Sequence, residues 1–320
     1  MSKVKSINPI ANKPLNSGKG DRGRQSGAAL LLVLLLLAVI SILVVNSAEN
    51  SYHLQRRLTM QKQQQAISTD LGAIEQYAFD YYAQSISSHN SSHPRQPWFE
   101  NYSLAINEST VKAKLSPATP CINLNSIIDF DLQHLQTSPA LLQLKFLLEN
   151  IQAPNPNNDI ALIHEYSSEI LRSSSLDPIA SKDSLAERLL AVGWKNEDWL
   201  RLNDFICFRP HNDSRWNTNN FSKEDIPLLR ALLLNQLDRE RSARLIDRIS
   251  KKPLSSNHQF WNMGELQSIE LPSQVKLQLQ LRDEFYWLRI TVARSHHKQA
   301  QWWFIQQQNQ VLKKLFSYRM

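Results

Sequence analysis

The sequence predicts an α+β protein with a long N-terminal helix, an antiparallel sheet and a large inserted all-α domain. Three observations predict it. The apolar run Ala28–Val45 continues into helix-compatible sequence, alternating apolar and polar residues occupy two separate regions, and helical periodicity fills the region between those two. A helical block between two groups of strands indicates that one domain is inserted into another.

The apolar run is long enough to cross a membrane. Its eighteen residues are interrupted only by Ser41, and a helix of that length covers about 27 Å, close to the hydrocarbon thickness of a bilayer. Because a basic flank keeps the N-terminus cytoplasmic, we expect a single-pass protein with everything after Asn46 on the far side. The basic residues of this flank are Lys3, Lys5, Lys13, Lys19, Arg22 and Arg24.

The same segment has three interpretations. A cleaved secretory signal would end at Asn46-Ser47-Ala48, but its apolar core is normally shorter. A plain signal anchor explains both the span and the orientation. A prepilin-type signal is cut on the cytoplasmic side, directly before the apolar helix, and needs a small residue there. Gly27 followed by Ala28 supplies that residue.

The excess of basic residues is a topology signal and does not indicate a nucleic-acid partner. The formal net charge is +7, and the first 27 residues carry six positive charges and one negative charge, a net +5. The remainder therefore carries only +2, which is too little for a nucleic-acid-binding surface.

Two cysteines, Cys121 and Cys207, are too few for a structural zinc site. Outside the cytoplasm two cysteines most simply form a disulfide, which we favour over two unpaired buried thiols. We expect no cofactor and no enzymatic activity, since the chain has no Gly-rich phosphate loop, Gly-x-Ser-x-Gly or His-Glu-x-x-His motif.

The chain from Ala28 onward divides into four parts. Residues 28–84 form one predicted helix, whose second half carries an apolar stripe at spacings of four and three (Ile67, Leu71, Ile74, Ala78 and Tyr81). Residues 98–125 contain short strands (102–106 and 111–115), and residues 126–262 are helical. Residues 265–320 form alternating strands, beginning with 275–281.

Two capping boxes are predicted within the helical part. Ser184-x-x-Glu187 is expected to open one helix, and Ser222-x-x-Asp225 to open another that runs to Leu237.

This layout and several motifs resemble the minor pseudopilin K family of bacterial type II secretion systems, also called general secretion pathway protein K. The leader ends in Gly27 and is followed by the apolar Ala28–Leu34. The other matching segments, in chain order, are Cys121–Asn125, Asp198–Asp204, Arg248–Ser255 and Phe285–Leu288.

The resemblance implies processing, location and partners. A prepilin peptidase would remove the leader (residues 1–27) and methylate Ala28, leaving the protein in the inner membrane with a periplasmic head of pseudopilin-like fold. The partners implied are I- and J-like minor pseudopilins in a tip complex, together with secreted substrates. The function implied is to initiate the pseudopilus and to help export folded proteins across the outer membrane.

One missing acid agrees with a position at the tip. Most prepilin-like subunits carry a glutamate at the fifth position after the cut, where it pairs with the α-amino group of the next subunit, because an unpaired carboxylate in a bilayer is costly. Leu32 occupies that position here, and no acid occurs between Ala28 and Asn46. The resembled family characteristically lacks this glutamate.

The resemblance also implies calcium in the helical domain, but this sequence departs from the pattern. Calcium needs about six to eight oxygen ligands, and Arg201 and Asn203 stand where acids are expected. Asp198 and Asp204, with Asp213 nearby, remain as candidate ligands; the alternative is that they are helix-surface charges.

Two other functions remain open from the sequence. A minor pilin of a type IV pilus would share the processed helix, and an unprocessed signal-anchored periplasmic adaptor would share only the membrane span.

Overall fold

A computed structural model describes residues 22–88, 91–92, 96, 102–106, 108–128, 130, 132, 138–172, 178–210, 215–294, 297–308 and 311–319. Side chains are not described at 22–29, 178–180 and 319. The chain divides into two compact units, 1–63 and 64–320. Helix α1 (Arg22–Ser87) begins in the first unit and ends in the second.

The first unit contains the apolar part of α1. Helix formation continues through this region because no proline follows Pro14 until Pro94. From Leu30 to Val45 every side chain is exposed within the chain. The described helix from Leu30 onward is long and apolar enough to cross a membrane.

The second unit contains a five-stranded antiparallel sheet in the order β1-β2-β7-β8-β9. Strand β2 pairs with β7 along its whole length, although the helical domain separates them in sequence. The sheet is therefore completed only by the last part of the chain, as an inserted domain requires. Its strands are β1 (Tyr102–Ile106), β2 (Ser109–Pro117), β7 (Phe285–Arg294), β8 (His297–Gln308) and β9 (Val311–Arg319).

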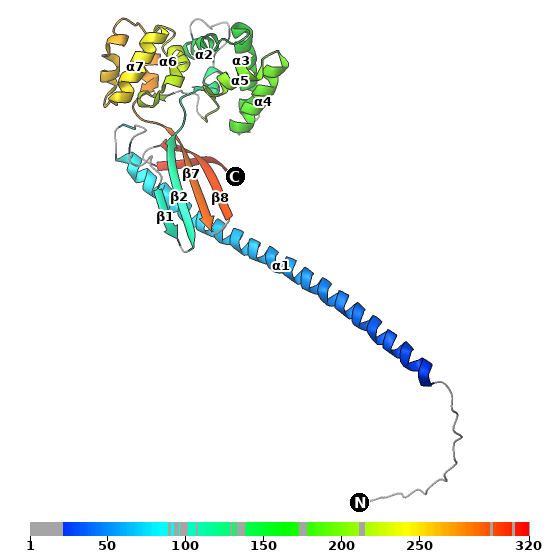
Figure 1. Cartoon of the computed structure of the whole chain (residues 1–320). Helices are drawn as coiled ribbons and strands as arrows, with labels where there is room; N and C mark the ends of the chain where they lie inside the picture. Colours follow the sequence, from blue (N-terminus) through cyan, green and yellow to red (C-terminus); the bar gives the residue numbers. More distant parts are fainter. Residues whose placement is uncertain are drawn as a thin grey trace, which may run out of the picture. The chain divides into compact units, whose positions relative to one another are not determined.

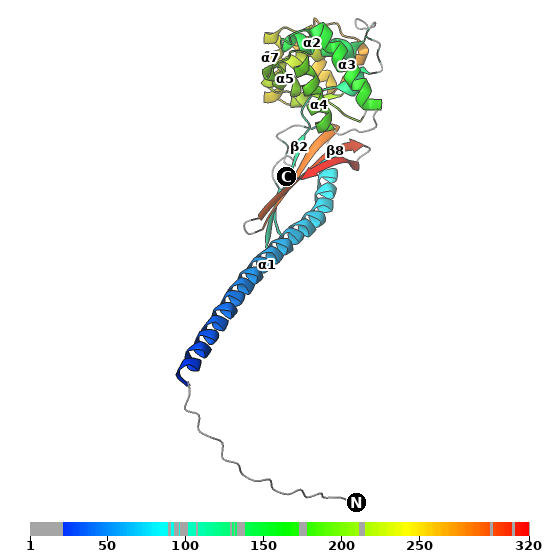
Figure 2. The same ribbon diagram turned by 90° about the vertical axis from the view of Figure 1, so that its right-hand side faces the viewer.

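The last turns of α1 cover one face of this sheet (Figures 1 and 2). Their buried side chains share a core with Val111 and Leu115 of β2 and with Leu288 and Ile290 of β7. The alternation of strand side chains thus directs one set toward α1 and the other set to the opposite face. The α1 residues in this core are Ile67, Leu71, Ile74, Ala78, Tyr82 and Ile86.

The predicted stripe on α1 is wrong at its last position. Tyr82 is buried, whereas Tyr81 is exposed and stacks near Tyr102. Tyr81 and Tyr82 lie three and four residues after Ala78, so both fit a helical stripe. Contact with the sheet determines that Tyr82 is the buried one. The helix also extends to Ser87, beyond the predicted end at 84.

The helical domain has its own core, which includes residues from Ile122 to Leu279 and so extends beyond the predicted range 126–262. Two short parallel bridges hold its ends: β3 (Ile122–Asn123) with β4 (Ile206–Cys207), and β5 (Trp216–Asn217) with β6 (Leu279–Gln280). The helices are α2 (Pro139–Asn150), α3 (Pro156–Arg172), α4 (Pro178–Ala191), α5 (Asn196–Asn203), α6 (Ile226–Leu232), α7 (Arg239–Lys251), α8 (Asn257–Trp261) and α9 (Ser273–Gln278).

Two local predictions in this domain need correction. Ser184 lies inside α4, which already begins at Pro178, so its capping box opens no helix. The predicted strand 275–281 is mostly helix α9, because Pro272 stands at its N-terminal cap and Val275 and Leu279 bury the same side four residues apart. Leu277, which a half-buried strand would bury, is 79% exposed.

The other capping box is present. The Ser222 hydroxyl donates to Asp225, whose carboxylate accepts the Ser222 backbone N–H. It opens the single 3₁₀ turn Lys223–Asp225 that leads into α6. Helix α6 ends at Leu232 rather than Leu237, since Leu234 and Asn235 adopt positive φ values that no helix accommodates.

Candidate functional site

The predicted cleavage site lies within the first turns of α1. Gly27 and Ala28 belong to the helical backbone, but their side chains lie outside the described residues. Leu32 is exposed along with the other apolar residues of the span. The structure therefore presents an uncharged helical surface at this position, and helix formation begins at Arg22, ahead of the predicted start at Ala28.

A second candidate site is the neck between the sheet and the helical domain, where residues 117–121 and 281–285 connect the two. Its centre is the buried carboxylate of Asp283. Ser92 donates to Asp283 Oδ2 at 2.6 Å, Asn217 donates to the same oxygen at 2.9 Å, and Asn220 donates to Oδ1. Two segments far apart in sequence therefore donate to one carboxylate.

Burial raises the pKa of Asp283, and its hydrogen bonds together with the charge of Arg209 oppose that shift. Arg209 is itself buried, which lowers its pKa to about 10 against the opposing charges of Asp283 and Glu284. Its guanidinium lies 4.7 Å from the centre of the Phe285 ring and donates to the Thr119 carbonyl. Arg209 thereby joins the helical domain to both connecting segments.

The Cys121–Asn125 motif supports Arg209 from the other side. The Asn123 side chain accepts the Arg209 backbone N–H at 2.9 Å, and the Asn125 side chain donates to the Arg209 carbonyl at 2.6 Å. Both asparagines are buried. The motif that carried part of the family resemblance is therefore structural, because it fixes the chain on either side of Arg209.

A disulfide joins Cys121 to Cys207 at the same place. The sulfurs are 2.06 Å apart, and the bond closes a sequence separation of 86 residues. It lies beside the bridge between β3 and β4, so it connects the entry of the helical domain to β4, the strand that follows α5.

A cleft of about 630 Å³ opens beside the disulfide. Its walls combine the aromatic side chains of Trp287, Phe304 and Phe316 with the cations Lys182 and Arg209. Lys182 donates to the Asn203 carbonyl at 2.6 Å. Burial lowers the pKa of Lys182 to about 8, partly offset by the charge of Asp204.

The candidate calcium ligands have other partners. The Asp198 carboxylate accepts the Lys195 backbone N–H and pairs with Arg201, so it caps α5; the Lys195 contact is the main reason that its pKa is lowered. Asp204 follows α5 and lines the cleft. Asp213 lies outside the described residues. Among the residues described, no three His, Cys, Asp or Glu side chains form a group that could hold a metal ion.

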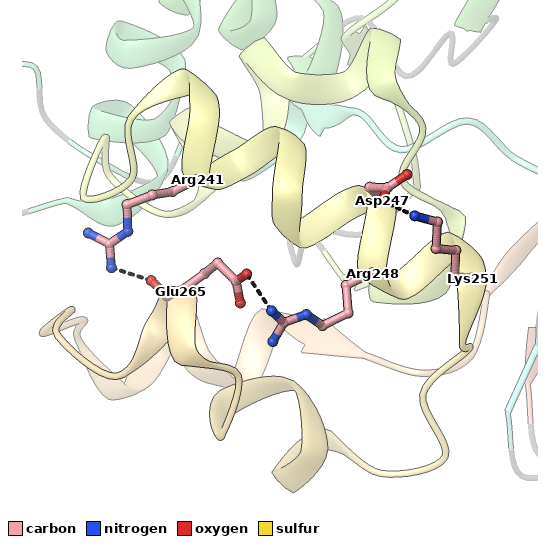
Figure 3. Close-up of polar contacts among 5 residues, drawn as sticks. All are labelled: Arg241, Asp247, Arg248, Lys251 and Glu265. Carbon is pink, nitrogen blue, oxygen red and sulfur yellow. Dashed lines mark hydrogen bonds and ion pairs between the residues drawn. The ribbon is translucent and has the colours of Figure 1, made fainter.

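The Arg248–Ser255 motif also proves structural. Arg248 of α7 forms an ion pair with the buried Glu265 at 3.0 Å, and Arg241 of the same helix donates to the Glu265 backbone carbonyl. Figure 3 shows both arginines reaching Glu265, while Lys251 pairs with Asp247 along the helix. These contacts attach α7 to the segment that returns toward the sheet.

The residues that meet at Asp283 were not found from the sequence. Ser92, Asn217 and Asn220 are common polar residues in turn-rich segments, and no spacing connects them with an aspartate more than 60 residues away. The only local signal is Asn217-Thr218-Asn219-Asn220, whose density of amides is unusual for buried sequence.

Comparison with known proteins supports the fold. No protein-family model matches the chain, and no curated protein matches its sequence. The chain is similar to a chain in the crystal structure of the GspK-GspI-GspJ complex from the enterotoxigenic Escherichia coli type 2 secretion system. The alignment covers 82% of this chain and 99% of that chain, with a TM-score of 0.63 and 18% identity. The predicted pseudopilin-like fold with an inserted helical domain is therefore confirmed.

Removal of the disulfide should destabilise the head. The Cys121→Ser/Cys207→Ser variant should lose roughly 2–5 kcal/mol of unfolding free energy, because a long loop in the unfolded chain is no longer closed. Urea denaturation of the full chain in detergent, followed by tryptophan fluorescence, measures this loss. Reductant should lower the stability of the unmodified chain and leave the double variant unchanged; equal stability of all four samples would contradict the prediction.

Lys182 should make stability rise in mildly alkaline solution. Its pKa is about 8 in the folded head against 10.5 ordinarily, so between these values the unfolded chain binds more protons and the free energy of unfolding increases with pH. Across this range the unfolding free energy of the unmodified chain, measured by denaturation, should therefore rise relative to that of Lys182→Met. Lys182→Arg, which stays charged, serves as the control. Parallel curves for Lys182→Met and the unmodified chain would exclude the effect.

Proposed function

We propose that this chain is a minor pseudopilin of a type II secretion system, processed by prepilin peptidase and placed at the tip of the pseudopilus. The observation that carries the proposal is the pseudopilin-like fold of the head, joined in one chain to an apolar helix that follows Gly27. In this role the protein is a structural subunit that initiates assembly and helps to export folded proteins. It acts without catalytic residues.

Chemistry at the N-terminus supports processing. The basic leader ends in Gly27, and removal of residues 1–27 leaves an α-amino group on Ala28 at the membrane surface. Methylation of that amine is the modification expected of a prepilin peptidase. The apolar helix then packs laterally against the helices of other subunits.

The absence of an acid supports the tip position. A subunit stacked above would bring a charged amine next to Leu32, and Leu32 offers it no counter-charge in a medium where an unpaired charge is costly. The inserted helical domain also supports the tip position, because so large a head would obstruct regular stacking along a shaft. I- and J-like minor pseudopilins are the proposed partners, by analogy with the complex that contains the similar chain.

The mature N-terminus tests the processing step. Mass spectrometry of the membrane form should find a chain beginning at methylated Ala28. Gly27→Val should retain the leader, because a branched side chain blocks the cut, whereas Gly23→Val, a change at another leader glycine, should be processed normally. Retention of Met1 in cells with an active prepilin peptidase would instead indicate an unprocessed, signal-anchored adaptor.

Substitution of Leu32 tests the tip position. Leu32→Glu supplies the carboxylate that a subunit above could use, so the variant should enter the shaft, where immunogold labelling of pseudopili would detect it along their length. Leu36→Glu, one helical turn further on, is the control, since it introduces the same charge at a depth where no amine meets it. If the unmodified protein already labels the shaft, it is not a tip subunit; localisation in a surface pilus would indicate a minor type IV pilin.

A further inference from the structure

The sheet has an unusual charge composition. Its five strands contain no aspartate or glutamate, but they carry eight lysines and arginines. The net charge of +2 for the chain after the leader hides this asymmetry, because the acids lie in the helices and loops. The sheet is therefore a cationic element within a nearly neutral head.

Two cations of the sheet pair with acids from outside it. Arg294 pairs with Glu108 at 2.8 Å, and Lys314 pairs with Glu75 of α1 at 2.7 Å. The face turned away from α1 is different, because four of its cations have no acidic partner among the described residues: Lys112, Lys114, Arg289 and Lys298.

These four cations gather at one groove. They line a hollow of about 350 Å³ on the outer face, together with Thr110, Thr291 and Ala293. In the strand register Lys114 lies directly opposite Arg289, and Lys298 lies opposite Ala293. Like charges on directly opposite residues destabilise a sheet, so the arrangement does not stabilise the fold on its own.

An aromatic cluster continues the groove. The Arg289 guanidinium lies 5.0 Å from the centre of the Trp302 ring, and that ring stacks parallel to Tyr318 at 6.0 Å. Trp287 contacts both rings from the next strand. All three aromatic side chains are half-buried. They form an apolar surface next to the cations, and aromatic residues and arginine are enriched where proteins bind one another.

We propose that this cationic face binds an acidic protein surface, and we define it as Lys112, Lys114, Arg289 and Lys298 with Trp287, Trp302 and Tyr318. The partner would place carboxylates among the four cations and apolar side chains on the rings. The sign of the charge identifies the partner's chemistry, because only an acidic surface relieves the repulsion between Lys114 and Arg289. The inference does not depend on the pseudopilin assignment.

A protein surface suits this face better than a lipid bilayer. Aromatic side chains that anchor proteins in membranes insert into the interface, whereas Trp302 and Tyr318 stack parallel to each other and Trp287 meets both rings edge to face. Their half-buried faces offer contact area without protruding side chains.

Lysine footprinting tests the proposal on the full chain. A soluble amine-acetylating reagent should modify Lys112, Lys114 and Lys298 roughly tenfold more slowly in native membranes than in purified detergent solution, because the partner covers them. Lys223 and Lys252, exposed lysines of the helical domain, should react equally in both. Equal reactivity of all five lysines in native membranes and in detergent overturns the proposal.

Two further measurements identify what covers the face. Reconstitution into phosphatidylcholine vesicles with and without phosphatidylglycerol separates lipid from protein: protection by anionic vesicles alone assigns the face to lipid and overturns the inference. Carbodiimide, which joins amines to carboxylates in contact, should link these lysines in native membranes to aspartates or glutamates of another chain.

Charge reversal supplies the matched variants. Lys112→Glu/Lys114→Glu/Lys298→Glu should abolish the complex extracted from native membranes, measured by its size in native gel electrophoresis, whereas the three lysine-to-arginine substitutions, which keep the charge, should retain it. Arg239→Glu/Lys223→Glu/Lys252→Glu, with the same change in net charge on the helical domain, should leave the complex unchanged. Loss of the complex in both charge-reversed variants would show that only net charge matters and would refute a specific site.

Discussion

The buried carboxylate of Asp283 is the contact on which the arrangement of the head depends. An ionised carboxylate is costly to bury, and removing one partner of a buried charge leaves an uncompensated group. Here the side chains of Ser92, Asn217 and Asn220 donate to it, and Arg209 lies close enough to affect its pKa. Since the donors come from the segment after α1 and from the helical domain, the carboxylate is satisfied only when those segments and the sheet are assembled together.

The neck also explains how one sheet tolerates a large insertion. Strands β2 and β7 pair over their full length, so the chain leaves the sheet at Pro117 and must return at Phe285. The Ala118 backbone N–H donates to the Phe285 carbonyl at 2.9 Å, which holds the exit and the return side by side. The disulfide and the paired asparagines around Arg209 then fix the first residues of the helical domain. The insertion is thereby held at its base, and its own core forms separately.

Elements with strong local patterns could be predicted from the sequence, whereas those decided by tertiary contact could not. The apolar run and the alternating strands 102–106 and 111–115 carry their own periodicity. Tyr81 and Tyr82 fit a helical stripe equally well, and only the position of the sheet buries Tyr82. At 275–281 the alternation was real, but Pro272 and burial four residues apart favoured a helix. At the site, the segments Cys121–Asn125 and Phe285–Leu288 that carry the resemblance lie at the neck, but neither includes Asp283. The role of Asp283 could not be predicted, because the residues that donate to it are scattered in the sequence and are individually ordinary.

The two faces of the sheet differ in what covers them and in their charge. One face is covered by α1, and its apolar side chains leave no freedom for recognition. On the other face Phe285 and Phe304 are also buried, but the remaining strand residues there include cations and aromatic rings and no acids. Stability alone would favour alternating charges across β2 and β7, as cross-strand pairs of opposite sign stabilise a sheet. A face that forgoes this stabilisation, while Arg294 and Lys314 elsewhere in the sheet pair with Glu108 and Glu75, has the composition of a surface that obtains its counter-charges from another molecule.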